Sequence, residues 1–554
     1  MVEAVERVTP DRPGPSDVTL PDGLRVVVDR HVVALDGGRV LLGGAPPRML
    51  RLTPAGRALL ADGGFAVTDP TSRALARRLL DGGVVHPVPG TGGPGPEQVT
   101  VVVPVKDRTG AVARLLAALP TDLGGVIVVD DGSADPDALR AVAGKVGARV
   151  LRHARPRGPA AARNAGLAEA MTPVVAFLDS DVLPTPGWLE PLLAHLADPA
   201  VGLVAPRIVA LPPVRGWLGR YEAVRSSLDL GPDPAVVVPR TRVAYVPSAA
   251  MLVRRSAVGV GFDDDMDVAE DVDLVLRLHA AGWRLRYEPA SRVAHDHRTG
   301  LRAWWLRKAY YGTGAAPLAL RHRGAVPPMV LSPWAAAVAG ALLARRPLVA
   351  AGVAAWAVQR LVPQLPELSR PWSAAARIVG LGAVGAVAQT ADAINRHYWP
   401  LTALACAVSA RARRTVAAVA LVEGVVDWVR HRDRDPSVRP GLLGHVVAHR
   451  LDDLAYGAGL WWGALRYRTL EPLRPTGPGF ARPGAGHPQR DGKESTMTGP
   501  DEQDKGTEVP DAAGLPHLDP PRGGMSEDPD SPDPVDVFPP RPGPPPAESG
   551  PDVS

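Results

Sequence analysis

Two apolar runs that each end in a pair of carboxylates constrain this chain more than any other feature of its sequence. Residues 126–129 lead directly into Asp130 and Asp131, and residues 174–178 lead directly into Asp179-Ser180-Asp181. Short apolar runs bounded by polar residues are typical of strands buried in a sheet. Open α/β folds bind their ligands at the carboxyl ends of such strands. The sequence therefore predicts an α/β domain with a ligand site where these carboxylates meet.

The chemistry of the carboxylates indicates which ligand binds there. Oxygen ligands suit Mg²⁺ or Mn²⁺ that bridges the phosphates of a substrate. Two carboxylate strand ends in one domain thus predict a nucleotide-diphosphate site, and a third acidic cluster, Glu270-Asp271-Val272-Asp273, opens a helical pattern farther along the chain. Taken alone, Asp179-Ser180-Asp181 is more typical of a turn, because short polar side chains hydrogen-bond to the backbone.

Residues 99–300 alternate apolar strands with helical patterns, which favours a mostly parallel sheet. The first predicted strand, residues 99–103, is followed by Pro104 and Val105. Later strands are expected at 126–129, 148–151, 174–178 and 201–205. Helices are expected at 110–119, 160–170, 188–196 and 271–281.

Residues 17–87 predict a small winged-helix-like domain, in which β-rich runs precede two helical stretches and a short final strand. Residues 89–98, rich in Pro and Gly, are a predicted linker. Nucleic acid is not an expected partner. Although Arg73, Arg77 and Arg78 are basic, no recognition helix with base-reading residues stands out.

Residues 301–474 differ in character and predict a helical, membrane-associated region. Residues 301–311 mix Arg and Lys with Trp and Tyr, a pattern typical of an amphipathic helix at a membrane interface. Uncharged stretches follow, the longest being the 17 residues 328–344. That length is at the lower limit for a spanning helix, which needs about 20 residues. An Ala-rich soluble helical domain remains the alternative.

Charge and cysteine content add two limits. Residues 475–554 carry 6 Lys/Arg against 15 Asp/Glu, so this Pro-rich tail has a net charge of −9 and is predicted to be disordered. The remaining body carries +13, which can attract phosphorylated substrates or an anionic membrane surface. The lone Cys406 excludes an intrachain disulfide, in keeping with the cytosol or the cytosolic face of a membrane.

Five short motifs occur in order along the central segment. They are Val101-Val102-Val103-Pro104-Val105, Val128-Val129-Asp130-Asp131-Gly132-Ser133, Ala162-Arg163-Asn164-Ala165-Gly166, Asp179-Ser180-Asp181 and Glu270-Asp271. Together they resemble a family 2 glycosyltransferase of the GT-A fold, over about residues 99–297. The N-terminal unit, the stretch 294–298 and the stretch 311–317 make the whole body similar to the mycofactocin-system glycosyltransferases.

The resemblance implies an inverting, metal-dependent enzyme that adds glucose units from UDP-glucose to a precursor of mycofactocin. Mycofactocin is a peptide-derived redox cofactor. It places the catalytic domain at the cytoplasmic face of the cell membrane. The N-terminal domain resembles winged-helix peptide-recognition domains, so it is expected to dock the precursor peptide, although a regulatory or structural role is equally open.

The resemblance also implies roles for the residues of the nucleotide pocket. Pro104 and Val105 would line the pocket, Asp131 would contact the uracil or ribose, and Asp130 would stabilise the same loop. Arg163 would approach the base or the diphosphate, since its planar guanidinium suits phosphate oxygens. The alternative for Arg163 is a charge on a helix surface.

By the same resemblance, Asp179 would face the ribose and Asp181 would bind the Mg²⁺ or Mn²⁺ ion. His295 is a candidate additional ligand, and a structural histidine is the alternative. Asp271 is the expected catalytic base, which takes the proton of the acceptor hydroxyl. In that interpretation Glu270 caps the helix and Asp273 faces solvent.

Two other functions stay open from the sequence alone. One is a membrane polysaccharide or lipid-linked-sugar glycosyltransferase of the same fold, although the chain lacks a Gln-x-x-Arg-Trp motif after the catalytic core. The other is a non-enzymatic scaffold that holds a peptide and only binds a nucleotide.

Overall fold

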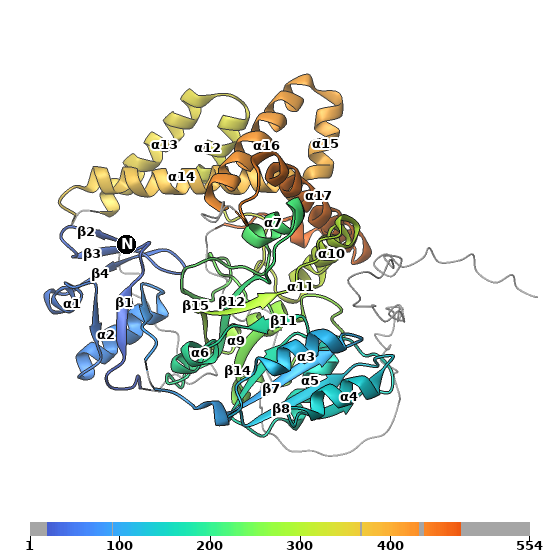
Figure 1. Ribbon diagram of the computed structural model, residues 1–554. Coiled ribbons are helices and arrows are strands. Elements are labelled where there is room, and N and C mark those ends of the chain that lie inside the picture. Colours follow the sequence, from blue (N-terminus) through green and yellow to red (C-terminus); the bar gives the residue numbers. More distant parts are fainter. Residues whose placement is uncertain (1–18, 91, 366–367, 432–436, 478–554) are drawn as a thin grey trace, which may run out of the picture.

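The computed structural model describes residues 19–90, 92–365, 368–431 and 437–477 (Figure 1). Three parts follow one another: a small unit of strands and helices, a large sheet with helices on both faces, and a group of long helices. The predicted acidic tail, residues 475–554, lies outside the described residues except for its first three.

The N-terminal unit contains two small antiparallel sheets, with the strand orders β5-β1-β6 and β2-β3-β4. Its elements are β1 (Arg25–Val28), β2 (Val33–Leu35), β3 (Val40–Gly43), β4 (Arg48–Arg51), α1 (Pro54–Leu59), β5 (Gly64–Ala66), α2 (Pro70–Asp81) and β6 (Val85–Pro87). Helix α2 begins at a capping box formed by Asp69 and Ser72. Its Leu79 and Leu80 are buried in a core shared with Val26 of β1. The winged-helix-like character of this unit stays a prediction.

The central sheet has nine strands in the order β11-β15-β12-β14-β10-β7-β8-β9, with β13 beside β15. They are β7 (Val99–Val105), β8 (Gly125–Asp130), β9 (Arg149–Arg152), β10 (Val174–Leu178), β11 (Val182–Pro184), β12 (Val201–Ala210), β13 (Ala235–Val236), β14 (Ala250–Arg254) and β15 (Arg284–His295). Neighbours from β10 to β9 are parallel, whereas β14 is antiparallel to both β10 and β12. Strands β12 and β15 also pair in parallel, so four of the eight pairings in this sheet are parallel. The expected parallel arrangement holds for β7, β8, β9 and β10, whereas the antiparallel pairings of β11, β13 and β14 were not predicted, because apolar runs report burial and do not fix strand direction.

Helices cover both faces of this sheet (Figure 1). They are α3 (Thr109–Ala117), α4 (Pro136–Gly144), α5 (Pro159–Glu169), α6 (Leu189–His195), α7 (Gly216–Arg225), α8 (Arg255–Val258) and α9 (Glu270–Ala280). The predicted helices that correspond to α3, α5, α6 and α9 are confirmed within two residues at each end. Strands β7 and β10 are buried along their whole length between two apolar cores, so their polar ends are the part of the sheet open to a ligand.

Long helices make up most of the last part of the described chain. They are α10 (Leu301–Thr313), α11 (Ala315–Arg321), α12 (Pro333–Leu343), α13 (Pro347–Leu361), α14 (Pro371–Arg396), α15 (Trp399–Val408), α16 (Ala410–His431) and α17 (Leu442–Arg466). Short 3₁₀ turns lie at Pro96–Gln98, Val362–Gln364 and Glu471–Leu473. By length and composition, α14 is the one helix among the described residues that is long and apolar enough to cross a membrane.

Helix α10 corrects the interpretation of residues 301–311 as an interfacial membrane helix. It packs along α17, and Trp304 and Lys308 are buried between α7 and α17. Close backbone contact makes this packing possible, because Gly459 of α17 lies against the carbonyl group of Ala309 and leaves no room for a side chain. Trp304 and Lys308 therefore lie inside the protein rather than along a lipid surface.

Ion pairs and apolar contacts join the N-terminal unit to the other two parts. Arg77 of α2 donates two hydrogen bonds, of 2.7 and 2.8 Å, to the Asp198 carboxylate of the central part. Val40 of β3 is buried with Leu365 and Ala375 of the helical part. The β2-β3-β4 sheet is thus covered by helices on one side.

Candidate active site

The end of β8 is held in place by its two carboxylates. Asp130 is buried, accepts a 2.8 Å hydrogen bond from the Ser133 amide and pairs with Arg152. These contacts fix the turn that follows, in which Gly132 has a φ of +83° and lies against Pro156. A side chain at this position would be strained and crowded, which explains the glycine.

Asp131 organises the loop that leads into α5. Its carboxylate accepts hydrogen bonds from the amides of Arg157 and Gly158, both 2.8 Å long, and lies 2.7 Å from Nδ1 of His153. Its own amide donates to the carbonyl oxygen of Val105, at the end of β7. Pro104, Val105, Asp130 and Asp131 therefore meet at one edge of the sheet, as parallel pairing of β7 and β8 requires. A contact of Asp131 with uracil or ribose stays a prediction.

Arg163 joins two of the acidic motifs. It is 3% exposed, so it is not a surface charge, and it donates to Asp179 at 2.6 Å and to Glu270 at 2.9 Å. Its guanidinium also lies 5.4 Å from the ring centre of Phe262. Arg163 thereby holds the carboxylates of β10 and α9 next to each other. Its predicted approach to the base or the diphosphate stays a prediction.

Asp181 and His295 lie together, although the sequence separates them widely. β11 pairs with the end of β15, which brings Nε2 of His295 to 3.5 Å from Oδ2 of Asp181. Arg108 donates to the same oxygen at 2.9 Å. Burial opposes ionisation of Asp181, but His295 and Arg108 hold its pKa below the ordinary value. Burial raises the pKa of Asp179, against the effect of Arg163.

The Asp181–His295 pair fits a divalent cation. Two ligands about 2.1 Å from one ion lie roughly 3.0 to 3.4 Å apart, close to the 3.5 Å observed. His297 lies beside the pair, with its Nδ1 3.1 Å from that of His295, and its Nε2 is buried without a hydrogen-bond partner among the described residues. Burial and the neighbouring His295 lower the pKa of His297 to about 3, so its ring is neutral and able to bind a metal.

Three arginines that the sequence reasoning did not single out surround this pair. Arg298, Arg307 and Arg108 are each half-buried, and desolvation together with the other two charges lowers the pKa of Arg298 to about 10. Such crowding of like charges is relieved when an anion binds, and bidentate guanidinium groups suit phosphate oxygens. Of the three, only Arg307 lies in residues 301–311, which were assigned to a membrane interface instead.

Asp271 lies in the first turn of α9 and faces the loop before β14. Its Oδ2 accepts a 2.9 Å hydrogen bond from the Ser248 amide, and Ser248 Oγ lies 3.4 Å away. The chain enters α9 through Ala269, whose φ of +66° turns the backbone sharply and directs the first-turn acids inward. Tyr245 is close to Asp271, and burial raises the pKa of its hydroxyl to about 12.

The other acids of this cluster differ from expectation. Glu270 pairs with Arg163, and burial together with the Asp271 charge raises its pKa to about 7. Asp273 does not face solvent: it is fully buried, and it pairs with Arg277 at 2.7 Å and with His322 at 2.8 Å. The prediction for Asp273 is wrong because its partner His322 directly follows α11, 49 residues along the chain, and local sequence does not reveal this contact.

The strand-end carboxylates, the basic residues around Asp181 and the acid at the start of α9 form one charged site at the edge of the sheet. The sequence matches the family model described as Glycosyl transferase family 2 over residues 100–259. It is 49% identical over 468 residues to the protein named Pre-mycofactocin glycosyltransferase of Mycobacterium tuberculosis, in each of two strains, covering 82% of this chain and 98% of that protein. The chain therefore belongs to the family 2 glycosyltransferases and, within them, to the pre-mycofactocin glycosyltransferase family.

More distant relatives match only part of the chain. Succinoglycan biosynthesis protein ExoU of Rhizobium meliloti is 28% identical over 209 residues, which cover 34% of this chain and 59% of that protein. Among solved structures, a mannosyltransferase from Pyrobaculum calidifontis, in complex with GDP-Man and Mn²⁺, is similar with a TM-score of 0.33 and 21% identity, over 64% of this chain and 92% of that one. The predicted family 2, GT-A-type α/β fold and the enzyme class are confirmed.

Proposed function

We propose that this chain transfers glucose units from UDP-glucose to a pre-mycofactocin acceptor, with inversion at the anomeric carbon and with the help of Mg²⁺ or Mn²⁺. The name of the 49% identical relative supports the acceptor. UDP-glucose and inversion follow from the family resemblance of the five motifs.

One observation carries the catalytic part of this proposal. Two sets of paired charges lie next to each other in the sequence and at the same edge of the sheet. His295 pairs with Asp181, and Arg163 joins Asp179 to Glu270, which Asp271 directly follows. These side chains are called the catalytic row. A metal ion and the diphosphate would bind near Asp181 and His295, and Asp271 lies at the opposite end of the row. This arrangement matches the two requirements of glycosyl transfer. Charge is offset where the donor leaves, and a proton is accepted where the acceptor attacks.

In the proposed step, the acceptor hydroxyl attacks the anomeric carbon while Asp271 takes its proton. A new carbon–oxygen bond forms, and the bond from the anomeric carbon to UDP breaks. The hydrogen bond from the Ser248 amide orients Asp271 for this transfer. A bound divalent cation, held by Asp181 and His295, would offset the charge that develops on UDP. Arg108, Arg298 and Arg307 would add positive charge at the same place.

A donor screen tests this function. Full-length protein in mild detergent receives UDP-glucose, UDP-galactose, UDP-N-acetylglucosamine or GDP-mannose, with and without Mn²⁺, and the release of UDP or GDP is measured with and without a pre-mycofactocin acceptor. We expect Mn²⁺-dependent release from UDP-glucose that increases when the acceptor is present. Release from another donor alone would refute the glucose assignment. Tight UDP binding with no release in the presence of acceptor would favour a nucleotide-binding scaffold.

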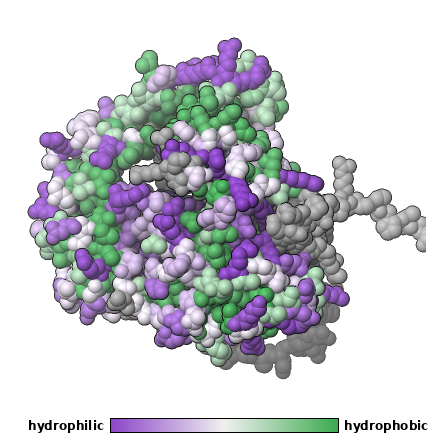
Figure 2. Space-filling view, viewed as in Figure 1, coloured by the Kyte–Doolittle hydropathy of each residue, from purple (hydrophilic) through white to green (hydrophobic). Residues whose placement is uncertain are grey.

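We also propose that the helical part attaches the enzyme to the cytoplasmic face of the membrane. Many large apolar side chains of α13 to α16 are exposed to solvent. They include Leu348, Trp356, Trp372, Leu381, Val384, Leu401, Leu404, Val408, Leu421 and Val422. Figure 2 shows hydrophobic residues gathered on the upper part of the molecule, over the C-terminal helices. Contiguous apolar surface of this kind is typical of a membrane or protein contact.

Flotation with vesicles containing anionic lipid tests the attachment. The double variant Leu404→Glu/Val408→Glu places charges on the most exposed turn of α15 and should remain largely in the unbound fraction. The matched variant Leu404→Ala/Val408→Ala should float more than the charged one, because it keeps the surface uncharged. Equal flotation of both variants and the wild type would remove α15 from the contact.

A further inference from the structure

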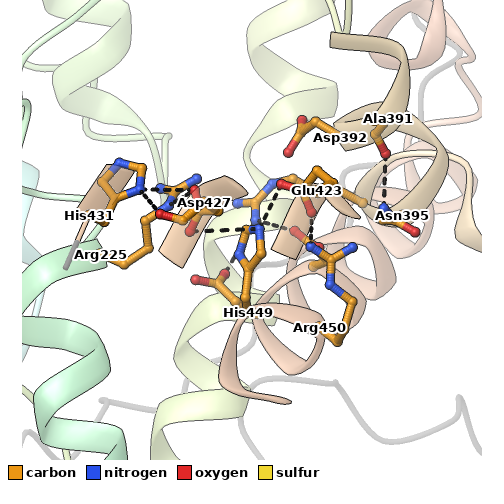
Figure 3. A network of polar contacts seen from close by, with 12 residues as sticks. Arg225, Ala391, Asp392, Asn395, Glu423, Asp427, His431, His449 and Arg450 are labelled. Atoms are coloured by element: carbon orange, nitrogen blue, oxygen red, sulfur yellow. Dashed lines mark hydrogen bonds and ion pairs between the residues drawn. The ribbon is translucent and has the colours of Figure 1, made fainter. Parts of the chain in front are cut away.

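A second group of potential metal ligands lies far along the chain from the catalytic residues, between helices α16 and α17. Glu423 and Asp427 are four residues apart on α16, and His449 faces them from α17 (Figure 3). One ligand atom of each lies within 4.8 Å of the others. Residues four apart share one helix face, so both carboxylates point to the same partner helix.

The distances among these atoms suit a single small cation. Nε2 of His449 lies 3.0 Å from Oε1 of Glu423 and 4.0 Å from Oδ2 of Asp427. Ligands in a tetrahedral zinc site, with bonds of about 2.1 Å, lie about 3.4 Å apart. The two distances from His449 bracket that value, and all three ligand atoms lie within 4.8 Å of one another, so rotation of the carboxylate side chains toward the centre would complete the site.

The outer oxygen of each carboxylate is already occupied, which aims the inner one at His449. Arg450 pairs with Oε2 of Glu423. Oδ1 of Asp427 accepts from Arg225 at 3.1 Å and lies 3.0 Å from Nδ1 of His431. His445, fully buried on α17, lies 2.9 Å from Oδ2 of Asp427 and holds this oxygen in position. Such outer contacts are typical of the groups that orient metal ligands.

The ring of His449 has a polar neighbour on each side. Its Nδ1 lies 3.3 Å from the Tyr221 hydroxyl, which also lies 3.1 Å from an Asp452 oxygen. Its Nε2 lies 3.0 Å from Oε1 of Glu423. When the ring proton is on Nδ1, Nε2 presents its lone pair to the Glu423 oxygen, and a metal ion bound between the two atoms satisfies both.

We propose that Glu423, Asp427 and His449 bind a structural divalent cation, for which Zn²⁺ is the best fit, and that this ion joins α16 to α17. Mixed imidazole and carboxylate ligands suit Zn²⁺, and three protein ligands leave a fourth position for water. Through Arg225 of α7, which pairs with Asp427, the ion also strengthens the attachment of the helical part to the catalytic part. The proposal is independent of the proposed donor and acceptor.

Zinc binding to the full-length protein tests this site. The Asp181→Asn background removes the carboxylate ligand of the proposed catalytic metal and so weakens that site. Zinc that Glu423→Gln releases in this background then belongs to the site between α16 and α17. After chelation and Zn²⁺ titration in mild detergent, we expect one equivalent of tightly bound zinc in this background. Adding Glu423→Gln should weaken the affinity at least 10-fold, because a neutral amide oxygen replaces a charged ligand. Adding His431→Gln, which changes only a contact to the outer oxygen of Asp427, should leave the stoichiometry unchanged.

Two further measurements keep the test decisive if Glu423→Gln misfolds. X-ray absorption at the zinc edge of the Asp181→Asn protein should show one imidazole and otherwise oxygen ligands. Zn²⁺ should also raise the thermal midpoint of that protein. Absence of bound zinc in the Asp181→Asn protein would overturn the proposal and leave a protonated His449 as the bridge. An unchanged affinity after Glu423→Gln, or a shell without imidazole, would overturn it as well.

Discussion

The catalytic row and the helical charge network use the same side-chain types in opposite ways. In the catalytic row, the side chains of Asp179 and Asp181 stay 30% and 19% exposed, so they keep oxygens within reach of a ligand. In the network of α7, α10 and α17, Glu222 and Asp452 are less than 8% exposed and share the buried Lys308. Placement at the end of β10 leaves the carboxylates of Asp179 and Asp181 partly open, whereas placement between packed helices closes those of Glu222 and Asp452.

This comparison teaches that ion pairing and accessibility decide the role of an acid, not its presence in an acidic motif. Asp271 and Asp273 lie two residues apart on one helix turn. Asp271 accepts from a backbone amide and stays partly exposed, whereas Asp273 is enclosed by Arg277, Arg321 and His322. We therefore assign chemistry to the first and stability to the second.

The largest expected effect comes from Asp271→Asn. The variant keeps the shape of the side chain but loses the proton acceptor, so transfer should fall by about 10²- to 10⁴-fold. UDP affinity measured by calorimetry should stay unchanged, because Asp271 does not contact the carboxylates around the proposed metal. Asp137→Asn, on an exposed carboxylate of α4, is the matched control. Near-normal turnover in Asp271→Asn would remove it as the base.

Lys308→Met should produce the largest loss of stability. Removing the charge leaves Glu222 and Asp452 buried without it, which typically costs about 3–5 kcal/mol. Urea unfolding in mild detergent measures the loss. Arg302→Met is the control on the same helix, since Arg302 is exposed, and it should change the free energy of unfolding by less than about 0.5 kcal/mol. Equal effects of the two variants would mean that the Lys308 ion pairs do not stabilise the interface.

Asp181→Asn should separate metal binding from catalysis. Without metal, UDP should bind this variant and the wild type alike. With Mn²⁺, the affinity gain seen in the wild type should shrink at least 10-fold in the variant, because a charged ligand is lost. Titration of UDP at several Mn²⁺ concentrations measures this difference. An identical Mn²⁺ dependence in both proteins would exclude Asp181 as a ligand.

The parts of the site that could be predicted from sequence are those built from neighbouring residues. Asp130, Asp131, Asp179 and Asp181 directly follow apolar strands, so local pattern was enough to place them at one edge of the sheet. The partners of Arg163 could not be predicted, since Glu270 lies 107 residues away. Helix α10 was misread for the same reason.

In the helical part, the sequence pattern of α10 did not predict its environment. Trp304 and Lys308 look amphipathic in isolation, and their partners Glu222 and Asp452 come from two other helices. Strand direction was equally hidden, because buried strands of either direction are apolar on both faces. The burial of α10 and the direction of the strands thus depend on tertiary contacts, which the periodicity of the sequence does not reveal.

The most gradual expected effect is a change in the pH dependence of stability through Glu270. Its pKa is raised to about 7 by burial and by Asp271, so between its ordinary value of 4.5 and 7 the folded state binds more protons than the unfolded state. Stability due to this group is therefore present below pH 4.5 and is lost as the pH rises toward 7, by up to about 1.4 kcal/mol per pH unit. Glu270→Gln cannot titrate, so the difference in unfolding free energy between wild type and variant should fall across this range and level off above pH 7. A difference that stays constant from pH 5 to 8 would show that Arg163 keeps Glu270 ionised throughout, and that this end of the catalytic row is as closed as the helical network.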